Sequence, residues 1–128
     1  MTTPFPPAAP LRCGLPENTI AAMRRVLANH PEVDEAILYG SRAMGRHRPA
    51  SDIDLTLIGP GLTSGALARI DADLDDLLLP WVIDLSSLSA ISHEPLLEHI
   101  RRVGQVLYRR DPAQPSWLIS SADARPGG

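Results

Sequence analysis

This chain of 128 residues has no lysine, a single cysteine and few aromatic side chains. With Cys13 alone, no disulfide can form within the sequence, so a disulfide scaffold is excluded and a reducing cytoplasm is the expected compartment. No apolar run approaches the roughly 18 residues that a membrane-spanning helix needs. The net charge of −3 argues against a surface that coats extended nucleic acid, because neutralising phosphates needs a basic patch.

The length and composition predict one small domain with a modest core. The first residues are rich in proline and lack the basic and apolar segments of a secretory signal. Proline, serine, alanine and glycine dominate from residue 109 onward. We therefore expect a flexible arm over 1–15, a folded domain over 16–108 and a disordered tail over 109–128, in which the apolar segment 117–119 could dock on the domain or on a partner.

Apolar periodicity predicts helices that alternate with strands. Helices are expected over 16–30, 41–44, 63–79 and 92–103, strands over 33–39, 51–58 and 81–85, and a closing strand or loop over 105–108. In the third helix, the stripe facing inward would contain Leu67, Ile70, Leu74, Leu77 and Leu78. This alternation predicts a small sheet covered by helices.

Two aspartates, Asp52 and Asp54, alternate with apolar residues in the second predicted strand. Side chains two apart on a strand share a face, with their Cα atoms about 7 Å apart. Asp84, in the next apolar run, can complete a three-carboxylate cluster if the strands are adjacent. Carboxylates suit Mg²⁺, and a pair of such ions can act on the attacking and leaving oxygens of a phosphoryl transfer. The alternatives are a solvated strand face for the pair, and a turn residue or helix cap for Asp84.

A Gly-Ser turn, Gly40 and Ser41, lies shortly before the aspartate pair. Gly40 has no Cβ, so a ligand can approach its backbone closely. If Ser41 begins a short helix, its hydroxyl and the free N–H groups after it can bind the β- and γ-phosphates of a nucleotide. Arg42 could pair with phosphate oxygens, or could balance nearby acids. The same choice applies to the other arginines of this loop, Arg46 and Arg48.

Histidines carry little weight in this interpretation. His47 lies in the same loop as these arginines and could touch phosphate, although a role without ligand contact is favoured. His93 and His99 do not have metal-ligand spacing with any cysteine, so both are expected at the surface or flanking a helix.

The segment GSRAMGRHRPASDIDL, from Gly40 to Leu55, resembles the signature of the DNA polymerase β-like nucleotidyltransferases, in which Gly-Ser precedes Asp-x-Asp on a strand. The short length, the S-D-I-D-L ending, the later VIDL and the pattern from Leu96 to Tyr108 are most similar to the minimal nucleotidyltransferases of bacteria and archaea. The resemblance covers roughly residues 16–108. One departure is Met44, where the family often carries arginine, which puts the strength of triphosphate binding in doubt.

The resemblance implies an α/β (α+β) fold with a small mixed sheet flanked by helices. It implies Mg²⁺, with two ions, and a nucleoside triphosphate, usually ATP, from which a nucleoside monophosphate is transferred to an acceptor hydroxyl. By motif match, Gly40 and Ser41 hold the triphosphate, and Asp52, Asp54 and Asp84 hold the metals, with Asp84 also helping to deprotonate the acceptor. Such minimal proteins often pair with a HEPN-domain protein, and in some pairs the nucleotidyltransferase is an antitoxin that adenylylates its partner.

Three functions remain open at this point. The leading hypothesis is a protein adenylyltransferase that acts as an antitoxin on a HEPN partner. The second is a binding module that neutralises such a partner by complex formation alone. The third is an antibiotic nucleotidyltransferase, which is disfavoured because such enzymes usually carry a further surface for the acceptor.

Overall fold

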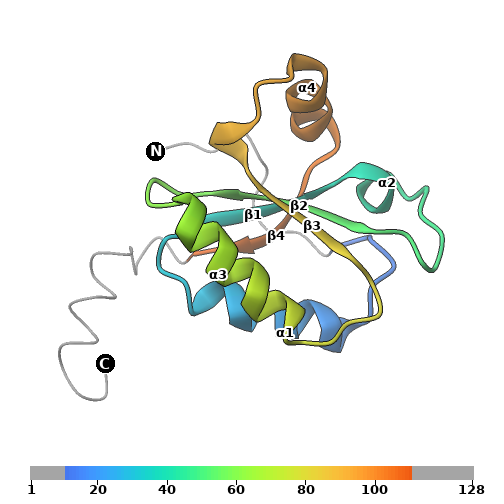
Figure 1. Ribbon diagram of the computed structural model, residues 1–128. Helices are drawn as coiled ribbons and strands as arrows, with labels where there is room; N and C mark the ends of the chain where they lie inside the picture. Colours follow the sequence, from blue (N-terminus) through green and yellow to red (C-terminus); the bar gives the residue numbers. More distant parts are fainter. Residues whose placement is uncertain (1–10, 111–128) are drawn as a thin grey trace.

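A four-stranded mixed sheet forms the centre of the protein (Figure 1). The computed structural model describes residues 11–110, whose strands are β1 (Glu35–Tyr39), β2 (Ile53–Ile58), β3 (Ile83–Ser87) and β4 (Gln105–Arg109). Their order across the sheet is β3-β2-β1-β4. β1 runs antiparallel to β2 and β4, whereas β3 runs parallel to β2. The expected small mixed sheet is confirmed, and the closing segment is a strand.

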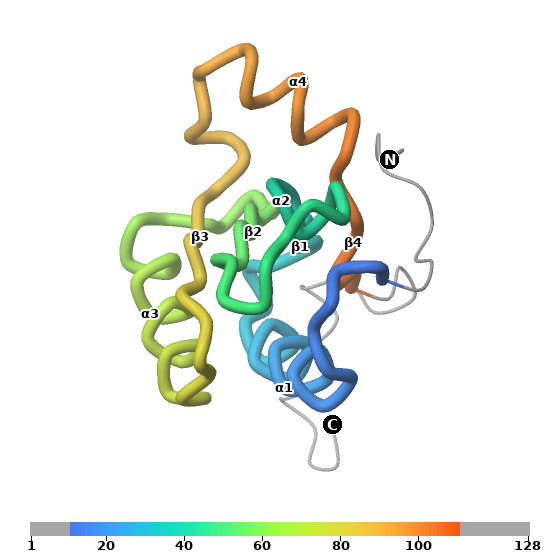
Figure 2. Tube along the Cα trace, turned by 90° about the vertical axis from the view of Figure 1, so that its right-hand side faces the viewer, coloured from blue at the N-terminus to red at the C-terminus, as the bar shows by residue number. Residues whose placement is uncertain are grey.

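Helices cover both faces of the sheet (Figures 1 and 2). α1 (Glu17–Ala28) and α3 (Ser64–Asp75) lie on one face and contact each other. α4 (Glu94–Val103) and a short 3₁₀ helix, η1 (Leu88–Ala90), lie on the other face. α2 (Gly40–Ala43) follows β1 directly. It lies at the end of the sheet where Asp54 of β2 pairs with Tyr39 of β1 and with Asp84 of β3.

The alternation of side chains on the strands explains these two layers. On β2, Ile53, Leu55 and Leu57 are fully buried against α1 and α3. On β1, Ile37 and Tyr39 point the other way and pack with Ile100 of α4. β1 is therefore buried along its whole length. Each large apolar side chain buried in this way stabilises the fold by about 1.5–3 kcal/mol.

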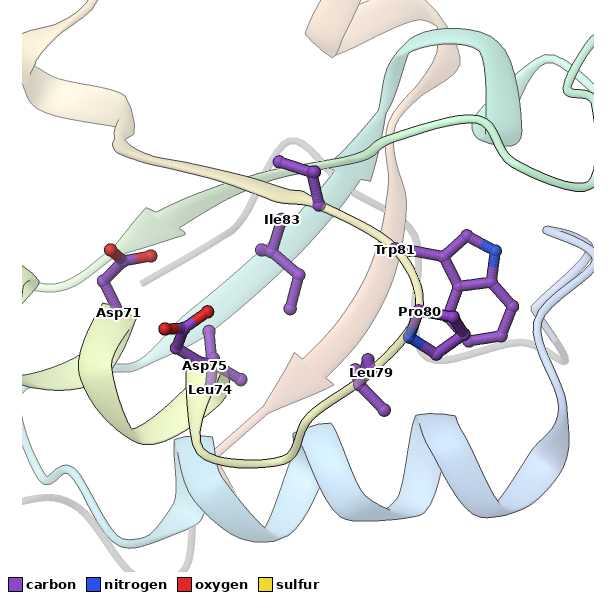
Figure 3. A pocket seen from close by; sticks show the side chains of 8 residues that line it. Asp71, Leu74, Asp75, Leu79, Pro80, Trp81 and Ile83 are labelled. Atoms are coloured by element: carbon purple, nitrogen blue, oxygen red, sulfur yellow. The ribbon is translucent and has the colours of Figure 1, made fainter.

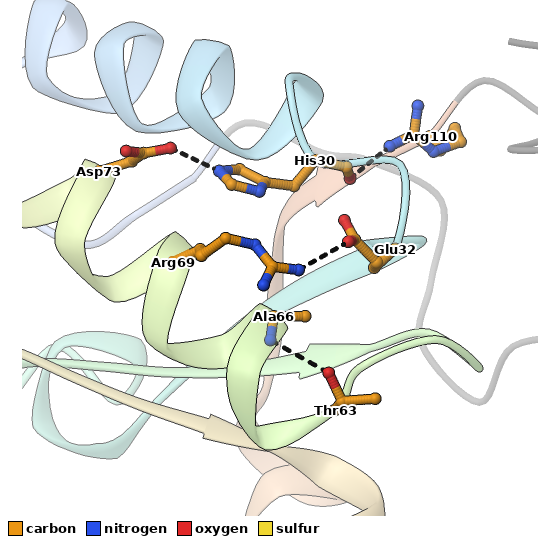
Figure 4. A network of polar contacts seen from close by, with 7 residues as sticks. All are labelled: His30, Glu32, Thr63, Ala66, Arg69, Asp73 and Arg110. Carbon is orange, nitrogen blue, oxygen red and sulfur yellow. Dashed lines mark hydrogen bonds and ion pairs between the residues drawn. The ribbon is translucent and has the colours of Figure 1, made fainter. Parts of the chain in front are cut away.

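Polar contacts join α3 to the end of α1 (Figure 4). Thr63 caps α3, since its hydroxyl accepts a hydrogen bond of 3.1 Å from the N–H of Ala66. Further along α3, Asp73 contacts His30 at 2.7 Å, and Arg69 lies 3.5 Å from Glu32. These contacts fix the register of α3 against the segment that follows α1, while its buried Ile70 and Leu74 supply the apolar contact.

The predicted inward stripe of α3 is wrong at its end. The helix stops at Asp75, so Leu78 does not continue the stripe. Leu78 is 87% exposed and adopts a left-handed conformation with φ of 54°. Leu77, by contrast, is partly buried against the core.

The folded part extends beyond both expected boundaries. Cys13 and Leu15, expected in a flexible arm, are buried in the core. Arg109 belongs to β4, and the guanidinium of buried Arg110 donates hydrogen bonds to the carbonyls of Val33 and His30. Residues 1–10 of the expected arm, and residues 111–128 of the expected tail with its apolar segment 117–119, lie outside the described residues. Within residues 11–110, no helix has the length and apolar character needed to cross a membrane.

Candidate nucleotidyltransferase site

Two carboxylates lie side by side on neighbouring strands. Asp54 of β2 pairs in register with Asp84 of β3 and, on its other side, with Tyr39 of β1. Residues paired in this way project from the same face of a sheet, here the face that carries α4. Asp54 is partly buried and Asp84 is exposed. The predicted adjacency of the two segments is therefore present.

Asp52 lies just before β2 and is exposed, whereas we expected it inside the strand. The chain next to it is nevertheless tied to the segment before β3, because the N–H of Ile53 donates to the carbonyl of Val82 at 2.8 Å. The negative charge of Asp52 also acts on Asp54, whose pKa is raised mainly by burial and further by the neighbouring carboxylates.

The donor chemistry of this cluster fits Mg²⁺, because all three side chains offer hard carboxylate oxygens. Among the described residues, however, no group of three or more acidic, histidine or cysteine side chains is drawn together closely enough to enclose an ion. The cluster thus has the ligand type but not the closed geometry of a filled metal site.

Asp54 is the carboxylate most affected by its surroundings. Burial raises the pKa of Asp54 above its ordinary value, and the negative charges of Asp84 and Asp52 raise it further. A positive charge on His99 lowers it. A cation bound here would reverse the effect of the neighbouring carboxylates, because it favours the ionised form.

Gly40 packs directly against Asp54. Its φ of 77° lies in the left-handed region, and a Cβ added there would overlap Oδ2 of Asp54. Gly40 is also the first residue of α2, so the short helix starts one residue earlier than predicted, and no side chain caps its start. Ser41 follows in the first turn and is partly buried. The turn thus brings backbone to the carboxylate at a distance that only glycine allows.

His99 of α4 reaches the same turn, a position that the sequence interpretation missed. The N–H of Gly40 donates a hydrogen bond of 3.1 Å to Nε2 of His99. The imidazole also meets the ring of Tyr39 edge-on, with centroids 6.2 Å apart. Because accepting at Nε2 requires the neutral ring, His99 can act on Asp54 as a positive charge only when this hydrogen bond is broken. A polar residue between Leu96 and Val103, at helical spacing from both, was the available signal.

Arg42 is not placed to hold phosphate, contrary to the prediction. Its side chain is buried, with 1% exposed, and donates to the carbonyls of Ser51, Cys13 and Pro49. The guanidinium also lies 5.6 Å from the ring centroid of Trp81. Arg42 therefore ties together the segment before α1 and the loop before β2.

The other side chains of the loop between α2 and β2 differ in how accessible they are to a ligand. Arg46 and Arg48 are exposed, as is Met44 at 38%. His47 packs against Gly14, where an added Cβ would overlap its ring. The two exposed arginines are thus the loop cations that remain accessible to an anion.

Polar side chains continue the site along the same sheet face. Ser86 of β3 donates to Thr56 of β2 at 3.0 Å. Burial raises the pKa of Tyr39, and the charges of Asp54 and Asp84 raise it further, whereas a hydrogen bond with Ser86 lowers it. Tyr39 therefore forms part of the sheet surface beside the carboxylates.

Two hollows lie along α3 and the β3 edge. The first, of about 430 Å³, is lined by residues of α3 and of the segment entering β3, among them Asp71, Asp75 and Trp81 (Figure 3). It contains none of the three predicted carboxylates. The second, of about 400 Å³, includes Asp84 in its lining. Of the three carboxylate residues, the second hollow therefore reaches Asp84 but neither Asp52 nor Asp54.

A family profile described as "Polymerase beta, Nucleotidyltransferase" matches residues 22–113. The chain belongs to the polymerase β nucleotidyltransferase family. The match spans the Gly-Ser turn and all three carboxylates, so the predicted resemblance is confirmed. A comparison with curated proteins found no match.

Solved structures with the same fold include toxin–antitoxin complexes. One, described as a toxin–antitoxin with AMP-PNP, is 22% identical, covers 86% of each chain and has a TM-score of 0.59. A second, described as a tri-AMPylated HEPN toxin of Shewanella oneidensis in complex with an MNT antitoxin, is 17% identical, covers 84% of each chain and has a TM-score of 0.56. At this identity the likeness establishes the nucleotidyltransferase fold of the present chain.

Proposed function

We propose that this nucleotidyltransferase transfers AMP from ATP to a hydroxyl group on a HEPN-domain protein and thereby acts as its antitoxin. The observation that carries the proposal is the contact of Gly40 with Asp54, which itself pairs in register with Asp84. This contact joins the turn expected to bind triphosphate to the carboxylates expected to bind metal.

Asp52, Asp54 and Asp84 would hold two Mg²⁺ ions. When bound, such ions neutralise the carboxylates and stabilise negative charge that develops on the phosphate oxygens. The pKa of Asp54 is raised by burial and, further, by the charges of Asp84 and Asp52, which supports this role because a nearby cation would favour the ionised form. Gly40 and Ser41 would present the turn to the triphosphate.

The transfer itself requires few groups of the protein. The acceptor oxygen forms a bond to the α-phosphorus, while the bond from that phosphorus to the oxygen bridging to the β-phosphate breaks. Pyrophosphate leaves, and the acceptor proton passes to Asp84. Asp84 suits this task because it is exposed at the edge strand, where a second protein can approach.

The choice of acceptor rests on the neighbouring structures. One is described as containing an AMPylated HEPN toxin together with an MNT antitoxin, and another as a toxin–antitoxin bound to an ATP analogue. The matched region covers most of both neighbouring chains, so the present chain has most of the fold that is found in those complexes.

The test is incubation of the purified protein with ATP labelled at the α-phosphate, Mg²⁺ and the HEPN-domain product of a neighbouring gene. Wild type, Asp54→Asn and Asp76→Asn are compared, since Asp76 is an exposed aspartate at the end of α3. Label on the partner with wild type and Asp76→Asn, but not with Asp54→Asn, is the expected result.

A stable complex without label in any sample would refute transfer and leave neutralisation by contact. The double variant Asp52→Asn with Asp54→Asn then separates the two biological roles. If that variant still binds but fails to neutralise the partner, contact is insufficient. If it neutralises the partner fully, adenylylation is not the antitoxin function.

A further inference from the structure

His99 lies on α4 but contacts Gly40, the first residue of α2. Its Nε2 accepts a hydrogen bond of 3.1 Å from the N–H of Gly40, and its ring meets Tyr39 edge-on. α4 is held to the sheet by its buried Ile100, with Leu96 and Val103 packed beside it, so this apolar contact does not depend on the hydrogen bond of His99.

Gly40 is consequently held from two directions. Its Cα faces the carboxylate of Asp54, with no room for a Cβ, and its N–H is bound by His99. A residue with φ of 77° has few alternatives once both contacts are made. Without the imidazole, the Gly40 N–H would lose this hydrogen bond, and the contact with Asp54 and the hydrogen bond from the Met44 N–H to the Gly40 carbonyl would remain.

We propose that His99 is a positioning residue of the nucleotide site, which fixes the Gly40 turn against Asp54 before the triphosphate binds. This inference rests on the proposed function, because it assigns the turn to the triphosphate. His99 acts through Gly40, and its contribution is the preorganisation of the turn.

A direct consequence concerns the tautomer of the ring. Nε2 can accept the Gly40 N–H only if the proton of the neutral imidazole resides on Nδ1. Long-range ¹H–¹⁵N correlation spectra of the protein report this tautomer without any nucleotide. The Nδ1–H form is expected, whereas the Nε2–H form would overturn the proposal.

Two variants separate the hydrogen bond from the shape of the ring. His99→Phe keeps a ring that can pack on Tyr39 but removes the acceptor. His99→Gln places Oε1 the same number of bonds from Cα as Nε2 and so keeps an acceptor. We expect His99→Phe to weaken binding of α,β-methylene ATP with Mg²⁺ by about threefold to tenfold, the range for one net hydrogen bond, and His99→Gln to restore it to within about twofold.

Calorimetric titration with that analogue, at a temperature where all three proteins are folded, gives the comparison. A merely structural role would lower the midpoint of thermal unfolding in His99→Phe and leave the nucleotide affinity of the folded protein unchanged, which would overturn the proposal. Equal affinities for the Phe and Gln variants would also overturn it.

Neither measurement needs transfer, so the two proposals can fail separately. If wild type has the expected tautomer and His99→Phe binds the analogue more weakly, but wild type transfers label to no acceptor, adenylyl transfer is refuted and the positioning role stands. If transfer occurs and His99→Phe binds and reacts as wild type does, the positioning role is refuted and the proposed function stands.

Discussion

Replacing Gly40 with alanine tests the contact on which the proposed site depends. Gly45 provides a matched control, because it has nearly the same backbone conformation, with φ of 71° against 77°. An added Cβ would overlap Asp54 at Gly40, whereas nothing lies within 4 Å of it at Gly45. The two substitutions therefore share the backbone strain and differ in the clash.

The shared part has a known scale. A left-handed conformation costs an alanine about 1–2 kcal/mol relative to glycine. Gly45→Ala should destabilise the protein by this amount. For a domain of this size, each kcal/mol lost lowers the midpoint of thermal unfolding by roughly 4–8 °C. Gly45 follows α2, where its left-handed conformation ends the helix, so the strain is local.

Gly40→Ala should cost about 1 kcal/mol more, since Asp54 must turn away from its present rotamer. The effect on function should be far larger than this difference. A turned Asp54 no longer lies beside Asp84, so we expect transfer to fall by about 100-fold or more, a loss of at least roughly 2.7 kcal/mol of transition-state stabilisation. Gly45→Ala should transfer within a few-fold of wild type.

Urea unfolding and the label-transfer assay together give both quantities. Adding Asp54→Ala to each glycine variant removes the carboxylate, so the two alanine substitutions should then cost equal stability. Equal transfer rates for Gly40→Ala and Gly45→Ala, with both folded, would refute the reasoning that the close approach of Gly40 positions Asp54.

Two further predictions follow from buried or crowded charges. Arg42→Met should destabilise the protein by about 3 kcal/mol or more in urea unfolding, because it leaves three carbonyls without their charged donor. The control Arg46→Met, at an exposed position, should change the stability by no more than about 0.5 kcal/mol. If Arg42→Met instead has normal stability and weakened nucleotide binding, Arg42 belongs to the phosphate site. The raised pKa of Asp54 means that its protonation favours the folded state, so the metal-free wild type should gain stability as the pH falls from neutral through that raised pKa towards the ordinary aspartate value. Asp54→Asn should therefore unfold at a higher temperature than wild type at neutral pH in a chelator, and this advantage should vanish in acid; an advantage that grows as the pH falls would contradict the sign of the shift.

The strand position of Asp54 could be predicted because it depends on local rules, whereas Asp52 lies just before the strand and the place of Asp84 depends on the pairing of β2 with β3. A strand presents alternate residues to one face, and glycine before serine marks a turn where backbone can approach a ligand. The order of helices and strands followed in the same way from apolar periodicity. These rules operate over a few residues, so one sequence is enough to apply them.

The ends of elements were less predictable. Leu78 continues the helical stripe of α3 in the sequence, but the chain leaves the helix at Asp75 and exposes that side chain. The segment containing Cys13 was expected to be flexible because it is rich in proline, yet it packs in the core and receives a hydrogen bond from Arg42. Such outcomes depend on partners far along the chain.

The sequence by itself determined the family, the alternation of strands and helices, and the three carboxylates with their Gly-Ser turn. Only the tertiary structure decided which polar side chains serve that turn. Arg42, next to Ser41 in the sequence, turns inward to carbonyls of two other segments, while His99 reaches Gly40 across 59 positions. The physical reason is that buried donors and acceptors must find partners wherever the packing of the sheet places them, and sequence distance does not enter that requirement.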